Sequence, residues 1–192
     1  LFVAAPSPAQ TIDRGWSDAS TATAIAASAV SVVMPRVFYS SPEATVGWKA
    51  RWHISALAPT MTHAALGFLN EAALKEAFAD PKPCAGCGGF GLFSTESYVA
   101  SASLGQGIAV FLVDTLQYSG GKFHFGGFAG HVLVPLVLTG ITAGGRIAAN
   151  EESGEQVLGS LGTGLLSGAV LGLVYSFSQE PECGYTGNLI CW

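Results

Sequence analysis

The segment that most constrains this chain covers residues 156–178 and contains no charged side chain over 23 positions. A helix needs about 20 mostly apolar residues to cross the hydrocarbon core of a bilayer, so this segment is long enough to span a membrane. The rest of the chain agrees, because only 11% of its 192 residues are charged and 49% are hydrophobic. An average soluble domain has roughly 25% charged residues. These values favour a helical membrane protein, and a very apolar soluble bundle is the alternative.

Four more helical segments are expected ahead of this one, separated by stretches rich in glycine, proline and polar residues. Residues 48–79 form one long helix, or two with Pro59 as the kink between them. Ser94 is the expected N-cap of the next segment, because its side chain can accept a hydrogen bond from the first turn. The five expected segments are residues 20–34, 48–79, 94–116, 128–149 and 156–178. The fold class is therefore all-α, a polytopic membrane bundle of about five helices.

The two ends of the chain differ in composition from this core. Residues 1–19 begin with an apolar run that turns into small residues and prolines, which resembles the tail of a secretory signal or a first membrane segment. A disordered leader is the alternative interpretation. Residues 20–179 are expected to form a single helical membrane domain, and residues 180–192 form a tail that contains cysteines.

Basic residues in the loops suggest an orientation in the membrane. The connector after the first segment carries Arg36, Lys49 and Arg51, and the loop after the third carries Lys122. If the segments alternate in direction, these loops lie on one side, which the positive-inside rule makes cytoplasmic. The glycine-rich loop at 80–92 and the acidic turn at 150–155 then face the exoplasmic or periplasmic side.

Charge and ligand spacing exclude several classes of function. Eight Lys and Arg against thirteen Asp and Glu leave no basic face for nucleic-acid phosphates. No histidine lies three or four residues from a second histidine or a carboxylate on one helix, so no metal site and no cofactor is expected. The histidines, none of them interpreted as catalytic, are His53, His63, His124 and His131.

Four cysteines form two pairs in the sequence. Cys84 and Cys87 lie in one glycine-rich loop, and Cys183 and Cys191 lie in the tail. Five helices would place the two pairs on opposite sides of a membrane, which argues against a shared metal. Disulfides within each pair and free thiols both remain open.

Small residues recur every fourth position along the last segment, at Ser160, Gly164, Gly168 and Gly172. Such a stripe lets another helix approach closely. It predicts either a contact with a partner subunit or close packing inside the chain's own bundle.

Three short segments, in order, carry a resemblance to a known family. They read KEAFADPKP at 75–83, FSTES at 93–97 and GRIAANEESGEQ at 145–156. Their order and spacing resemble the signatures K-x6-R-P, F-P-S-G-H and S-R-x5-H-x3-D of the type 2 phosphatidic-acid phosphatase (vanadium haloperoxidase-like) superfamily. In that family the Lys and the two Arg bind the substrate phosphate, the third-motif His attacks phosphorus with its Asp as orienter, and the second-motif His protonates the leaving group.

The resemblance implies a degenerate member that lacks the catalytic histidines. Cations, in altered form, remain at the phosphate-binding positions Lys75, Lys82 and Arg146. The acid, the nucleophile and the orienting Asp are replaced by Ser97, Glu152 and Gln156. Because a serine hydroxyl is no acid near neutral pH and an amide carries no charge, the proton transfers of the family have no carrier here. We therefore expect a pseudoenzyme.

The same segments suggest what Arg146 contacts when no phosphate is bound. Glu96, Glu152 and Glu155 are the expected anions, and Glu151 adds to the negative charge of the pocket. A partly buried arginine without a partner is costly. We expect one of these glutamates to pair with Arg146, and we expect the regions of Lys82, Ser97 and Glu152 to meet at one end of the bundle.

Three functions remain open. The first is a structural or accessory subunit of a membrane protein assembly, in contact with other membrane protein subunits and lipids. Its tail, with Tyr185 and Trp192, offers a further partner surface. The second is a binding module for a lipid head-group or another anion, and the third is an active lipid phosphatase with unorthodox residues.

Overall fold

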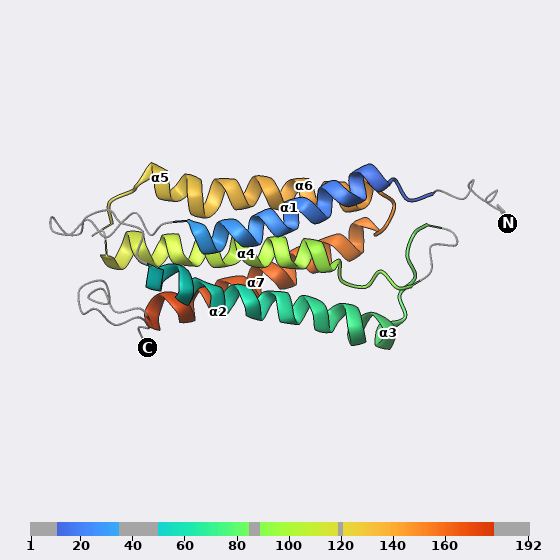
Figure 1. Ribbon diagram of the computed structural model, residues 1–192, viewed down its shortest axis with the longest axis horizontal. Coiled ribbons are helices and arrows are strands. Elements are labelled where there is room, and N and C mark those ends of the chain that lie inside the picture. The colour runs from blue at the N-terminus through green and yellow to red at the C-terminus, as the bar shows by residue number, and fades with distance from the viewer. Residues whose placement is uncertain (1–10, 35–49, 85–88, 119–120, 179–192) are drawn as a thin grey trace.

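The computed structural model contains five continuous helices that lie side by side in one elongated bundle (Figure 1). It describes residues 11–34, 50–84, 89–118 and 121–178, and within these ranges there is no named strand. The all-α prediction is thus confirmed.

The first helix is α1 (Arg14–Val33). The second comprises α2 (Ala50–Leu69), the π-helical turn η1 (Asn70–Leu74) and α3 (Lys75–Phe78), and the third comprises α4 (Thr95–Val113) and η2 (Asp114–Tyr118). The fourth comprises α5 (Phe125–Phe128), η3 (Ala129–Leu133) and α6 (Val134–Ala148), and the fifth is α7 (Gly154–Ser178).

Two capping residues set where the first and third helices begin. The Ser94 side chain accepts a hydrogen bond from the Ser97 N–H at 3.2 Å, as the sequence predicts. Asp13 caps α1 in the same way, accepting from the N–H of Gly15 at 2.9 Å. The prediction that the first helix starts at residue 20 is therefore wrong, because the helix begins at Arg14.

The second helix is one helix, not two. It continues through Pro59 to Phe78, which is the first of the two alternatives that the sequence left open. It ends at Ala79, whose φ of 49° lies in the left-handed region. Pro81 follows shortly after, and a proline cannot donate the next helical hydrogen bond.

The centre of the bundle is the contact between α4 and α7. A Cβ at Gly164 or Gly168 would fall on backbone carbonyl oxygens of Tyr98 or Ala102, and a Cβ at Gly172 would lie 2.8 Å from the Cα of Gln106. These glycines let the two helices touch backbone to backbone. The stripe of small residues therefore packs inside the chain's own bundle, which is the second of the two alternatives.

Three of the helices are long and apolar enough to cross a membrane, at residues 95–116, 125–148 and 154–177. Most residues of the first are buried by its neighbours, whereas most residues of the other two are at least partly exposed. Along α7 the exposed face carries large apolar side chains, including Leu166, Val174 and Phe177. An apolar surface of this kind suits contact with lipid better than contact with water.

The helices alternate in direction, so the loops gather at two ends (Figure 1). One end, on the right of the figure, holds the start of α1, α3, the start of α4 and the turn from α6 to α7. The start of α5 and the end of α7 lie at the other. The three segments that carry the family resemblance thus come together at one end.

Candidate functional site

Six charged side chains gather at the end of the bundle where α3, α4 and the α6–α7 turn meet. We call them the charge cluster: Glu71, Lys75, Glu96, Arg146, Glu151 and Glu152. They come from the second, third and fourth helices and from the turn that follows the fourth. Four carboxylates face two cations, which gives the cluster a formal charge of −2.

A sharp turn after α6 returns the chain onto Arg146. Asn150 has a φ of 58°, in the left-handed region that asparagine tolerates better than most residues. The N–H of Glu151 then donates to the carbonyl of Arg146 at 3.3 Å. The turn therefore points the next two carboxylates back at the guanidinium.

Arg146 is the centre of the cluster and is only 4% exposed. Its Nε and one Nη donate to the two carboxylate oxygens of Glu152, each at 3.2 Å. The other Nη contacts Glu96 at 3.2 Å and also pairs with Glu151. All three nitrogens of the guanidinium are therefore engaged by carboxylates, and the expected ion pair of Arg146 is confirmed for Glu96 and Glu152.

Glu152 is the most buried member of the cluster, with 1% of its surface exposed. Besides the two-point contact with Arg146, it lies 3.8 Å from the Nζ of Lys75. Lys75 is itself buried and binds Glu71 one helical turn earlier at 2.7 Å. Two of the three cations that the resemblance assigns to phosphate binding, Lys75 and Arg146, are thus occupied by carboxylates.

The remaining cation of the predicted set, Lys82, lies half-buried in the loop after α3. Burial raises the pKa of Glu71, but hydrogen bonds from Lys75 and Thr95 and the charges of Lys75 and Lys82 outweigh this effect and lower that pKa overall. Lys82 is therefore close enough to Glu71 to act on its ionisation.

Ser97 and Gln156, at the other two degenerate positions, make structural hydrogen bonds. Ser97 is fully buried, and its Oγ accepts from the Ser94 hydroxyl at 2.9 Å. The Gln156 amide donates to Asp80 at 2.6 Å and to the Pro81 carbonyl at 3.1 Å, which ties the start of α7 to the loop beside Lys82. A Cβ at Gly91 would meet this amide at 2.5 Å, so the glycine makes room for it. The predicted meeting of the Lys82, Ser97 and Glu152 regions at one end of the bundle is confirmed.

Two details of the cluster differ from the sequence prediction. Glu155 is exposed in the first turn of α7, and within the described part of the chain it forms no ion pair with Arg146. Its place is taken by Glu151, which also accepts a hydrogen bond from the Ser17 hydroxyl of α1 at 2.6 Å. The reason is the left-handed turn at Asn150, which directs residues 151 and 152 inward.

None of the ion pairs of the charge cluster involves a cysteine or histidine of the residues that the structure describes. Cys84 is disulfide-bonded, and the other predicted cysteines, Cys87, Cys183 and Cys191, lie outside the described residues. His63 and His131 are buried in the bundle. Over the ranges that the structure describes, no group of three His, Cys, Asp or Glu side chains could hold a metal ion.

The arrangement favours structural roles over chemistry. Each carboxylate of the cluster already accepts from a cation, and an anion would meet the cluster's net negative charge. Neither a scan of protein-family models nor searches of curated proteins and of solved structures finds a match to this chain.

Proposed function

We propose that this chain is a non-catalytic, phosphatase-like membrane protein that acts as a structural or accessory subunit of a membrane protein assembly. The observation that carries the proposal is the occupation of Arg146 by three glutamates. A guanidinium can bind a phosphate with the same forked geometry that it uses for a carboxylate. In this chain that fork is taken by Glu152, and the remaining nitrogen is taken by Glu96 and Glu151.

The positions that would move protons support the same conclusion. Ser97 has no exposed surface, and the Gln156 amide donates its hydrogen bonds to the loop that follows α3. General acid–base catalysis contributes about 10²–10⁴-fold to a rate. This chain lacks that contribution. Its one candidate nucleophile, Glu152, is held by two cations, so the chain has no evident route to phosphoryl transfer.

The charge cluster instead joins parts of the chain that are distant in sequence. Through Ser17 it reaches α1, and through Lys75 it reaches the end of the second helix. We propose that the charge cluster occupies the place of a substrate pocket and holds the helices together, so that the bundle serves as a scaffold for membrane protein subunits and lipids. On the positive-inside argument the cluster faces the exoplasmic or periplasmic side.

The test begins with hydrolysis. The protein purified in mild detergent should release no phosphate above a buffer blank from phosphatidic acid, a prenyl diphosphate or p-nitrophenyl phosphate. A turnover that disappears in Glu152→Gln, but persists in the exposed control Glu155→Gln, would refute the proposal and identify Glu152 as a working nucleophile.

A second experiment separates the accessory subunit from the anion-binding module. Extraction from native membranes followed by size-exclusion chromatography should yield the protein with companions in fixed ratio. Saturable binding of inorganic phosphate or of phosphatidic-acid vesicles, lost when Lys82 is replaced by Gln, would favour the anion-binding function instead.

A further inference from the structure

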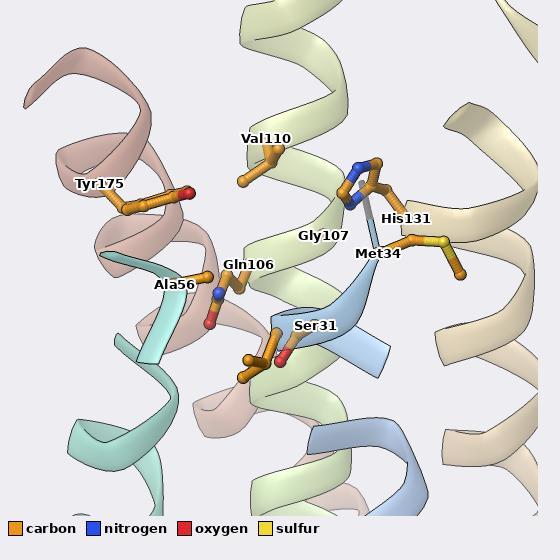
Figure 2. A pocket seen from close by; sticks show the side chains of 9 residues that line it. Ser31, Met34, Ala56, Gln106, Gly107, Val110, His131 and Tyr175 are labelled. Atoms are coloured by element: carbon orange, nitrogen blue, oxygen red, sulfur yellow. The ribbon is translucent and has the colours of Figure 1, made fainter. Parts of the chain in front are cut away.

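A small cavity with a mixed polar and apolar lining lies between the helices of the bundle (Figure 2), and none of its lining residues belongs to the charge cluster. Its polar lining comes from four helices, through Ser31 of α1, Gln106 of α4, His131 of η3 and Tyr175 of α7. Gln106 lies ten residues beyond Glu96 along α4, a distance of about 15 Å. The cavity has a volume of about 10 Å³, which is close to what one water molecule requires and too small for a lipid.

Close helix packing on both sides fixes Gln106 at this place. A Cβ at Gly107 would fall on the carbonyl oxygen of His131, and a Cβ at Gly172 would lie 2.8 Å from the Cα of Gln106. Glycines at these two positions let α4 approach η3 on one side and α7 on the other. The Gln106 side chain is therefore held between helices, with 2% of the residue exposed.

The amide oxygen of Gln106 lacks a hydrogen-bond donor. Its Oε1 is buried and accepts no hydrogen bond from the part of the chain that the structure describes. A buried carbonyl oxygen without a donor is costly, and more so in a bundle whose helices are apolar enough to cross a membrane. Ser31, on the same cavity wall, donates its hydroxyl hydrogen to the Ser28 carbonyl at 2.7 Å. It also lies 3.2 Å from the Thr60 hydroxyl, which donates to the Ala56 carbonyl at 2.9 Å, so the Ser31 oxygen keeps a lone pair that can accept.

We propose that this cavity binds one ordered water molecule, which donates one hydrogen to Gln106 Oε1 and the other to Ser31 Oγ. A water supplies the donor that Gln106 Oε1 lacks and has a second hydrogen for Ser31 Oγ, in the volume present. A cation is disfavoured, because no carboxylate lines the cavity and an unpaired charge in an apolar interior is costly. The water connects the last turns of α1 to α4, whereas Ser17 and Glu151 secure the first turn of α1 at the other end.

The first test is a double-mutant cycle on thermal unfolding in detergent. Gln106→Met and Ser31→Ala each remove one partner of the same water, so the double variant should lower the melting temperature by clearly less than the sum of the two single shifts. Ser28→Ala is the matched control, because its hydroxyl bonds the carbonyl of Ala24 within its own helix. The double variant of Ser28→Ala and Gln106→Met should lower the melting temperature by the sum of the two single shifts. Additive shifts for Ser31→Ala and Gln106→Met would overturn the proposed water bridge.

A direct image decides the ligand. A crystallographic or cryo-EM map that resolves ordered waters should show one density within hydrogen-bond distance of Gln106 Oε1, and the same map of Gln106→Met should lack it. A protein donor on Oε1, or a side chain filling the cavity, would overturn the proposal.

Discussion

Replacing Arg146 by methionine tests whether the charge cluster stabilises the fold. Methionine keeps much of the side-chain volume and removes the charge, so the variant leaves the carboxylates of Glu152, Glu151 and Glu96 without their shared cation. Glu152 suffers most, because it is 1% exposed and its other cation, the Nζ of Lys75, lies 3.8 Å away. Glu151 keeps its hydrogen bond from Ser17, and Glu96 can turn toward water.

The expected magnitude follows from the burial of this pair. Removing one partner of a buried ion pair costs about 3–5 kcal/mol in the free energy of unfolding. In a chain of this size 1 kcal/mol corresponds to about 2–4 °C in melting temperature. We therefore expect Arg146→Met to lower the melting temperature by about 10 °C, measured by intrinsic tryptophan fluorescence in detergent.

The controls separate the loss of the pair from a general effect of charge. Glu155→Gln removes an exposed carboxylate of the same turn and should change the melting temperature by no more than about 1 °C. Arg146→Met/Glu152→Met should recover part of the loss, because no buried carboxylate then lacks its partner at position 152. An Arg146→Met variant with the same melting temperature as the native protein would refute the view that the charge cluster stabilises the fold.

Three further predictions concern other contacts. Gly168→Ala should destabilise the protein by about 1–3 kcal/mol, because its Cβ meets backbone of α4, whereas Gly162→Ala on the open side of α7 should be neutral or slightly stabilising in the same melt. Glu71→Gln should lower the melting temperature at pH 7, and this effect should shrink as the pH falls below the ordinary glutamate pKa of about 4.3, because the lowered pKa of Glu71 adds stability that is lost as the pH falls through its folded value. Gln156→Leu should speed proteolysis between Asp80 and Gly91, since it removes both amide hydrogen bonds to that loop; unchanged cleavage would contradict this.

The number of helices and their approximate positions could be predicted from the sequence, because apolar composition and capping residues act locally. Ser94 was recognisable as an N-cap, and the α7 segment stood out by its lack of charge. The start of α1 was missed, since Asp13 precedes a polar first turn that composition alone assigns to a leader. The π-helical turns also have no local signature in this sequence.

The sequence predicted the Arg146–Glu152 pair of the candidate site but not the contacts that Glu71 and Ser17 add to it. Arg146 and Glu152 are six residues apart, so a turn between them was enough to suggest the pair. Glu71 and Lys75 could have been found from their helical spacing of four residues. The contribution of Ser17 could not, because it depends on how α1 packs against a turn more than 130 residues later.

The backbone contact between α4 and α7 has a consequence for the order of events during synthesis. α4 is the most enclosed of the three apolar helices, yet the partner that covers its serine and glycine face is α7, which follows it in the chain and leaves the ribosome later. Until then Ser101 lacks the carbonyl of Ser160, to which its hydroxyl later donates at 3.3 Å. α4 therefore stays without this cover until α7 has been synthesised, so the centre of the bundle can form only after α7 has emerged.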